Sequence, residues 1–360
     1  MDNLINYIKE NGQKTYDELK FNEIDAAVYC VLSYINFDGI NITNIKIKDL
    51  YEIYIKKFTL KEKDKFNQKN RELFNIMSKS IRYKNNFVTD YKKINNKITQ
   101  FQALAIKVPH HFKFIAFEGT DDLLVGWEED FKMSYLYPVP AEEHAKEFLN
   151  SNIKFNDFVV YVAGHSKGGR LAITSSMEQS RFKKYQIDYI FNFDGPGVLP
   201  EVTNEKKYLS ILKKVRNYYP EESIVGMIFE SMGKKIITKS TAFKIYQHSI
   251  HTWKINNNKF ETGSLSKESK EFHLKIENVI NKFSEEERKY FVTTFFNLLY
   301  TSGYTFKSEL KKISPQKMKN LLKETTSLNE NERKLILEMF KTLIKNTSFE
   351  EENKNNVQKR

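Results

Sequence analysis

Short hydrophobic runs alternate with helix-like segments through the middle of the chain. The runs are rich in β-branched and aromatic residues and cover residues 98–108, 112–117, 158–163, 189–193 and 215–219, with weaker ones at 235–238 and 251–255. Runs of this length and composition favour strands. Pro140, followed by Glu142 and Glu143, is a typical helix start between two of them. Strands that alternate with helices predict a mostly parallel sheet covered by helices on both faces.

The two flanks of this region have a helical pattern. From residue 16 to about 95 apolar residues recur every three or four positions, and beyond Gly263 amphipathic segments begin with signals such as Ser284 before three glutamates. An apolar face at residues 335–344 is expected to pack on the core, with a membrane-surface or partner helix as the alternative. We therefore predict a helical lead-in (1–95), an α/β core (96–262), a helical C-terminal region (263–349) and a frayed tail (350–360).

One segment carries a candidate nucleophile. Gly164, Ser166 and Gly168 form a G-x-S-x-G motif that joins an apolar run directly to a helix-forming run. An α/β-hydrolase nucleophile elbow requires this order of strand, sharp turn and helix, which projects the serine Oγ from the sheet. The competing interpretation is a glycine-rich turn with an incidental serine. The flanking elements favour the elbow.

A nucleophilic serine requires a base, and the chain has seven histidines. The α/β-hydrolase order of serine, acid, histidine leaves His248 and His251. We favour His248, which lies in a predicted loop, and expect His251 to have a packing role. His165 directly precedes Ser166, and we expect its side chain to point away from the serine Oγ.

The acid has more than one candidate. Only Asp188 and Asp194 are aspartates that follow Ser166. Active sites of open α/β sheets lie beyond the carboxyl ends of the strands, where Asp194 is expected, whereas Asp188 begins a strand. We favour Asp194, with a plain turn residue before Gly-Pro-Gly as the competing interpretation. Glu221 or Glu222, after the next strand, is the alternative acid.

The predicted oxyanion donors come from two places. The run 112–117 ends at Glu118, Gly119 and Thr120, in a loop at the same sheet edge as the elbow. We expect this loop and the backbone N–H of Lys167 to supply the donors of the oxyanion hole. The Lys167 ammonium is also expected to attract an anionic group of a substrate.

Composition restricts partners and location. The net charge is +12 and the pI about 9.2, but lysines are scattered and no arginine-rich block alternates with aromatics. This pattern predicts no nucleic-acid partner and a weak attraction to anionic membrane surfaces. The single cysteine, Cys30, cannot form an intrachain disulfide, and its position in an apolar run predicts a buried structural thiol. The chain lacks a signal-peptide pattern and a long apolar span, so we expect a cytoplasmic location, with no cofactor or metal.

Five landmarks carry a family resemblance: F-E-G-T at 117–120, Trp127 with Asp130, G-H-S-K-G-G at 164–169, V-R-N at 215–217, and His248 with Trp253. They resemble landmarks of class 3 (fungal-type) triacylglycerol lipases, most closely a bacterial branch of lipase-like proteins with a G-H-S-K-G-G elbow. The resemblance covers about residues 24–260. It implies Ser166 as nucleophile, His248 as base and Thr120 as an oxyanion residue. The fungal-type acid position is here Glu221-Glu222, and Lys167 replaces an apolar residue.

Two hypotheses for function follow. The first is a serine hydrolase that cleaves a carboxylic ester, as a lipase, esterase or phospholipase does, through an acyl-enzyme on Ser166. The second is a hydrolase-fold scaffold whose catalytic set has decayed and whose helical C-terminal region binds partners. Nucleophile, base, candidate acid and oxyanion loop are all present, which favours the enzyme.

Overall fold

The computed structural model describes residues 3–58, 65–303 and 305 of the 360-residue chain. The predicted apolar face at 335–344 and the predicted tail from 350 lie outside the described residues. Within the described ranges, no helix is long and apolar enough to cross a lipid bilayer.

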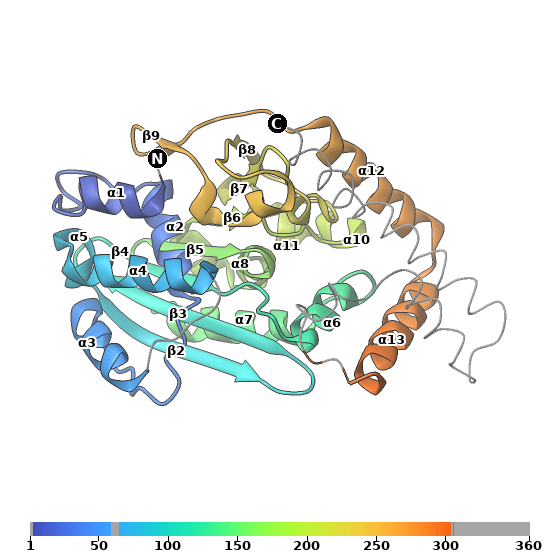
Figure 1. The fold of residues 1–360 in the computed structure, drawn as a ribbon, viewed down its shortest axis with the longest axis horizontal. Coiled ribbons are helices and arrows are strands. Elements are labelled where there is room, and N and C mark those ends of the chain that lie inside the picture. The colour runs from blue at the N-terminus through green and yellow to red at the C-terminus, as the bar shows by residue number, and fades with distance from the viewer. Residues whose placement is uncertain (1–2, 59–64, 304, 306–360) are drawn as a thin grey trace, which may run out of the picture.

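An eight-stranded mixed sheet forms the centre of the molecule (Figure 1). Its strands lie side by side in chain order: β1 (Ile45–Lys46), β2 (Phe87–Asn95), β3 (Gln100–Val108), β4 (Phe112–Phe117), β5 (Val160–His165), β6 (Ile187–Phe193), β7 (Val215–Pro220) and β8 (Lys234–Thr238). Strands β1 to β4 pair antiparallel, and β4 to β8 pair parallel. This architecture confirms the predicted α/β fold, with a mostly parallel sheet covered by helices.

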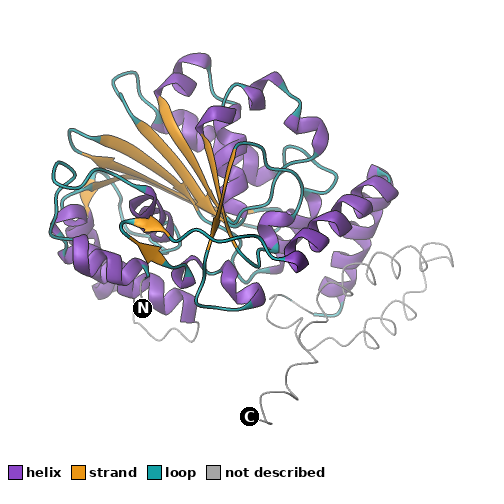
Figure 2. Ribbon diagram, turned by 90° about the horizontal axis from the view of Figure 1, so that it is seen from above, coloured by secondary structure: helices purple, strands orange, loops and turns teal. Residues whose placement is uncertain are grey.

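Helices cover both faces of the sheet (Figure 2). On one face α2 (Glu23–Leu32) contacts β4, β5 and β6, and α1 (Leu4–Asn11) and α4 (Lys65–Lys79) pack against α2. On the other face α7 (Pro140–Asn152) and α8 (Lys167–Met177) contact the same part of the sheet. The shorter helices are α3 (Ile47–Lys57), α5 (Ile81–Lys84), α6 (Leu124–Lys132), α9 (Arg181–Gln186), α10 (Pro200–Thr203) and α11 (Lys206–Leu209).

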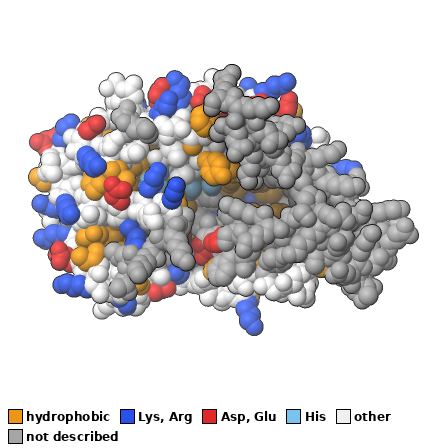
Figure 3. Space-filling model, viewed as in Figure 1, with side chains coloured by type: hydrophobic (Ala, Val, Ile, Leu, Met, Phe, Trp, Pro, Cys, Tyr) orange, Lys and Arg blue, Asp and Glu red, His pale blue; other side chains and the backbone are white. Residues whose placement is uncertain are grey.

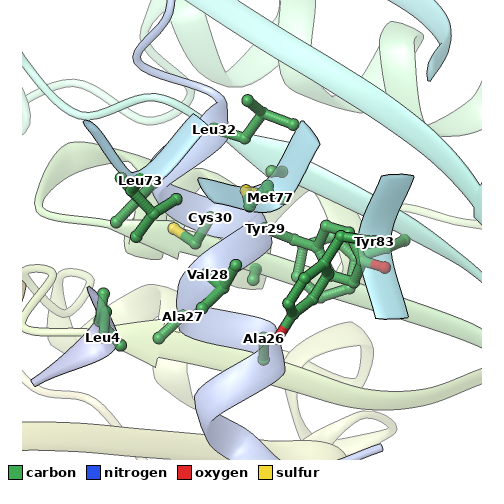
Figure 4. Close-up of a cluster of buried hydrophobic side chains, with 14 of the residues drawn as sticks. Leu4, Ala26, Ala27, Val28, Tyr29, Cys30, Leu32, Leu73, Met77 and Tyr83 are labelled. Carbon is green, nitrogen blue, oxygen red and sulfur yellow. The ribbon is translucent and has the colours of Figure 1, made fainter. Parts of the chain in front are cut away.

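Helix α2 is buried around its whole circumference. Every residue from Ile24 to Leu32 is buried, and Leu4, Leu73 and Met77 from neighbouring helices pack around it (Figure 4). A helix that is apolar on all sides is typical of a protein core. Cys30 lies inside this cluster as a free thiol whose pKa is raised by burial. The expectation of a buried structural thiol is confirmed.

Residues 87–95 correct the prediction that the N-terminal region is helical to about residue 95. They form β2, which pairs antiparallel with β3. The strand is polar and mostly half-buried, and it includes Asp90, Lys92 and Lys93. Its strand conformation comes from pairing with apolar β3 rather than from its own composition, because β-propensity depends strongly on neighbouring strands.

The start of the C-terminal region is helical, as predicted. Helices α12 (Lys267–Lys282) and α13 (Glu285–Thr301) follow a small hairpin of β9 (Ile255–Asn256) and β10 (Lys259–Phe260). Ser284 caps α13 in a capping box with Glu287. Phe295 and Phe296 of α13 pack against Phe131 of α6. The division of the chain into domains stays a prediction.

Candidate active site

Ser166 occupies the sharp turn between β5 and α8. Its backbone has φ 57° and ψ −134°, a conformation that is strained for a residue other than glycine. A Cβ at Gly164 would collide with the backbone of Gly168, so glycine is required for this close approach. The Ser166 N–H donates to the Phe193 carbonyl oxygen (3.0 Å), which fixes the turn to the end of β6. The predicted strand, sharp turn and helix are all present.

His248 and Asp194 form a hydrogen-bonded pair beside this turn. The His248 Nδ1 lies 2.7 Å from Oδ2 of Asp194. The Asp194 side chain is completely buried, whereas 23% of the His248 side chain is exposed. The other carboxylate oxygen, Oδ1, accepts hydrogen bonds from the Ser223 hydroxyl and from the Gly226 N–H (3.2 Å). A carboxylate held in this way fixes the Nδ1–H tautomer and leaves Nε2 with a lone pair.

Three neighbouring parts of the fold bring these residues to one edge of the sheet. Ser166 follows β5 and Asp194 follows β6, and these two strands are parallel neighbours. His248 ends a 3₁₀-helix, Lys244–His248, after β8. The Ser166 Oγ makes no hydrogen bond to any described residue. Such bonds are often long in unliganded active sites and tighten when substrate binds.

The alternative acids have other partners. The Glu222 carboxylate accepts hydrogen bonds from Nε2 of Gln247 (2.6 Å) and from the Lys244 N–H (2.7 Å). Glu221 accepts one from the Ser264 N–H (3.4 Å). Neither carboxylate bonds to His248. Glu222 instead holds the segment that carries this histidine.

His251 is buried, and its Nε2 donates to the Asn70 Oδ1 over 2.7 Å. Burial lowers the pKa of His251 to about 3, so the ring is neutral. His251 is therefore buried, as the predicted packing role requires, and its hydrogen bond joins it to a residue 181 positions away in the sequence.

The two predicted oxyanion residues differ in what their side chains do. The Thr120 hydroxyl donates to Oδ2 of Asp130 over 2.6 Å. Gly168, in the first turn of α8, packs on the Phe117 carbonyl oxygen, which brings the start of this helix beside the loop that contains Thr120. The first N–H groups of a helix have no intrahelical partner and favour negative charge.

The expectation for the Lys167 ammonium is wrong. Its side chain is 1% exposed and pairs with Glu129 over 3.2 Å. The same Nζ donates to the backbone and side-chain oxygens of Gln100 (2.7 and 2.8 Å). The residue after Ser166 points into the protein, where Glu129 on α6 compensates its charge. The ammonium therefore does not reach a substrate, and only the Lys167 backbone is at the elbow.

His165 and Tyr34 form a hydrogen-bonded support that sequence reasoning missed. The His165 Nε2 lies 2.7 Å from the His248 carbonyl oxygen, and Nδ1 lies 2.7 Å from the Tyr34 hydroxyl. A carbonyl oxygen only accepts, so Nε2 donates to it, and Nδ1 accepts from Tyr34. Burial, and then the nearby His248, lower the pKa of His165 well below 6.5. Tyr34 is 131 residues away in sequence, so no local pattern indicated this contact.

Glu118 brings a second buried ionisable group close to the site. It lies in the loop between Phe117 and Thr120, and Nε2 of Gln100 donates to its carboxyl group over 3.1 Å. Burial, and then the nearby Asp121, raise the pKa of Glu118 to about 8. The carboxyl group is therefore mostly protonated at neutral pH.

Among the described residues, one group has donor atoms close enough together to approach a metal ion: Glu230, His273 and Glu277, within 4.8 Å of one another. The Lys235 ammonium already pairs with Glu230 over 3.2 Å. His273 also donates from Nδ1 to the Met227 carbonyl oxygen. We assign no metal to this group.

The surface view shows where a histidine is accessible. Histidine atoms lie in a hollow near the middle of the face seen in Figure 3, with hydrophobic, lysine and arginine side chains beside it.

Comparison with known proteins gives a family and distant structural similarity. No curated protein matches the chain. The crystal structure of M37 lipase shares 17% sequence identity with it, over 58% of this chain and 70% of that one, with a TM-score of 0.37. The sequence profile of the Mbeg1-like family matches residues 77–297, which include Ser166, Asp194 and His248. This match covers more than half of the 360-residue chain, so the chain belongs to the Mbeg1-like family.

Proposed function

We propose that the protein is a serine hydrolase that cleaves carboxylic esters through an acyl-enzyme on Ser166. The observation that carries this proposal is the 2.7 Å contact between His248 and the fully buried Asp194, at the same sheet edge as the strained turn of Ser166. A buried carboxylate that orients a partly exposed imidazole beside an elbow serine matches the roles of a catalytic triad.

The proposed reaction has two steps. In the first, the Ser166 Oγ attacks the ester carbonyl carbon while Nε2 of His248 takes the serine proton, and Asp194 stabilises the imidazolium. His248 then returns this proton to the leaving alcohol. In the second step water attacks the acyl-enzyme with the same assistance from His248, which releases the acid and restores Ser166.

The backbone N–H groups of Thr120 and Lys167 stabilise the tetrahedral oxyanion in this proposal. The Thr120 hydroxyl is already committed to Asp130, so the backbone N–H is the donor left at this residue. The Lys167 N–H lies in the first turn of α8, where the helix dipole adds partial positive charge.

The substrate that we infer is an ester with an apolar acyl group, such as a lipid. Phe243, Ile245 and Tyr246, just before His248, have 78%, 42% and 69% of their surface exposed. Exposed apolar side chains beside a catalytic group supply the contact surface that an acyl chain needs.

Ester turnover tests the proposal directly. The wild-type protein should hydrolyse p-nitrophenyl butyrate, and Ser166→Ala should abolish this activity while thermal unfolding is unchanged. Ser151→Ala, which changes a serine at the end of α7, is the matched control and should keep full activity. Equal turnover by Ser166→Ala and wild type would refute the proposal. A folded wild-type protein inactive on all esters tried would favour the scaffold hypothesis.

A further inference from the structure

Four exposed aromatic side chains gather at the amino edge of the parallel strands. Phe155, Phe158, Phe182 and Tyr185 have 86%, 92%, 47% and 86% of their surface exposed. The first two lie in the connection before β5, and the other two lie on α9, before β6. Val160 of β5 pairs with Ile187 of the parallel strand β6. Phe158 and Tyr185 each lie two residues before one of these paired positions, so both lie at the same end of the sheet. We call this set the aromatic edge.

Hydrogen bonds to the backbone hold the aromatic edge in place. The Gln186 side chain, which is buried, donates to the Lys154 carbonyl oxygen (2.8 Å) and to that of Asp157. The Asp157 carboxylate accepts from the Lys154 N–H (2.7 Å) and pairs with Lys113 (3.0 Å). The rings of Phe155 and Phe182 stack with centroids 5.2 Å apart. These aromatic side chains are therefore held in exposed positions. Exposed apolar surface is unfavourable in water, and a binding function explains why it is present here.

Basic side chains surround the aromatic edge. Lys154 and Arg181 are exposed. In the sequence, Lys183 and Lys184 stand between Phe182 and Tyr185. Partial burial, and then the nearby Lys154, lower the pKa of Lys183, which indicates that these cations lie close together. Of the nearby acids, Asp157 is neutralised by Lys113, and Asp188 lies close to Lys214. The surface is therefore aromatic at its centre and positive around it.

We propose that the aromatic edge is a docking site for an anionic lipid bilayer. Phenylalanine and tyrosine side chains partition into the boundary between headgroups and acyl chains, and each nearby lysine adds attraction to anionic headgroups. Single-stranded nucleic acid needs ring faces that lie open on a platform. Here Phe155 and Phe182 stack on each other, which covers one face of each ring, and Phe158 and Tyr185 are almost fully exposed. This arrangement suits insertion into a fluid layer.

This docking turns the proposed active site away from the bilayer. The aromatic edge precedes β5, whereas Ser166 follows it, and a six-residue strand spans about 20 Å. An ester would then reach Ser166 from the aqueous side of the docked protein. The docking proposal does not depend on catalysis, because it rests on residues outside the candidate active site.

Vesicle sedimentation tests the docking. The full-length protein should bind vesicles of phosphatidylcholine and phosphatidylglycerol (3:1), bind phosphatidylcholine alone more weakly, and dissociate in high salt. Phe155→Ser with Phe158→Ser should lower the partition coefficient by about tenfold or more. Ile98→Ser, which removes an apolar side chain that is 62% exposed in the β2–β3 turn, is the matched control and should bind as wild type. Unchanged melting temperatures establish that the variants fold.

A second measurement locates the contact. The wild type has two tryptophans, Trp127 and Trp253, and brominated lipids should leave their fluorescence unchanged. Phe158→Trp should add a component that brominated acyl chains quench. The proposal is overturned if the wild type does not bind anionic vesicles, or if the Phe155→Ser, Phe158→Ser protein binds them equally well. It is also overturned if the edge instead joins two copies in light scattering, or binds oligouridine in preference to vesicles.

Discussion

Asp194 is the residue on which the proposed chemistry depends most at the scale of single side chains. Its carboxylate is fully buried and accepts from Ser223, Gly226 and His248. Several donors to one buried carboxylate fix its orientation. The His248 tautomer therefore follows from the Asp194 environment.

Asp194→Asn should lower kcat by about 10³-fold or more, because the amide no longer holds the Nδ1–H tautomer of His248. The melting temperature of Asp194→Asn should stay close to that of the wild type. Glu222→Gln is the matched control: its carboxylate bonds to Gln247 rather than to His248, so its effect on kcat should be small. Steady-state ester hydrolysis measures both. A larger loss in Glu222→Gln than in Asp194→Asn would favour the fungal-type acid position.

His165→Phe should lower kcat by up to about 10²-fold with little change in KM. The variant keeps a ring in place but removes the hydrogen bonds to the His248 carbonyl oxygen and to Tyr34. A small displacement of a catalytic base has an effect of this size. Tyr34→Phe removes only the hydrogen bond between the Tyr34 hydroxyl and Nδ1 of His165, so it should lower kcat less. Wild-type kinetics in His165→Phe would show that His165 does not position His248.

Sequence reasoning could place Asp194 and Ser166 at one edge of the sheet because each follows an apolar run that forms a parallel strand. It could not predict which side chains support His248, because those contacts join residues far apart in the chain. It also failed for Lys167. A lysine after a nucleophile suggests a surface charge, and only the position of Glu129 reveals that the lysine is buried.

At the scale of elements, strand prediction succeeded where the strand itself is apolar. Strands β4, β5 and β6 have mostly buried residues, and their sequences are correspondingly hydrophobic. Strand β2 has mostly half-buried positions, and its charged residues conceal it. A strand whose conformation depends on pairing with a neighbouring strand shows little hydrophobic pattern in its own sequence.

Helix α8 is attached to its neighbours by two buried ion pairs, Lys167 with Glu129 and Arg170 with Glu142. Lys167→Met should lower the free energy of unfolding by about 3–5 kcal/mol, because it leaves the Glu129 carboxylate buried without its cation. Adding Glu129→Gln should recover part of this loss. Urea denaturation measures both. A Lys167→Met protein as stable as the wild type would show that the Lys167–Glu129 pair does not hold α8 in place.

At the scale of the whole molecule, buried ionisable groups predict how stability depends on pH. The pKa of Glu118 is raised to about 8, so its contribution to stability is lost as pH rises toward and through 8. The pKa of His251 is lowered to about 3, so its contribution is lost as pH falls from about 6.5 toward 3. Burial also lowers the pKa of His165 well below 6.5, so His165 adds to the loss on the acid side. The free energy of unfolding should therefore decline both above and below about pH 6.5.

Glu118→Gln isolates the alkaline part of this dependence. The neutral amide cannot ionise, so the variant should be more stable than wild type at pH 9 relative to pH 5, by more than about 1 kcal/mol. Denaturation curves at the two pH values measure the difference. The same pH dependence in variant and wild type would contradict the raised pKa of Glu118.

The most direct test of the central claim is labelling with a fluorophosphonate probe, which reacts only with an activated serine. We expect that wild-type protein is labelled on Ser166, that Ser166→Ala is not labelled, and that Asp194→Asn is labelled much more slowly. A folded wild-type protein that resists the probe, or labelling that persists in Ser166→Ala, would contradict the assignment of Ser166, His248 and Asp194 as a catalytic triad.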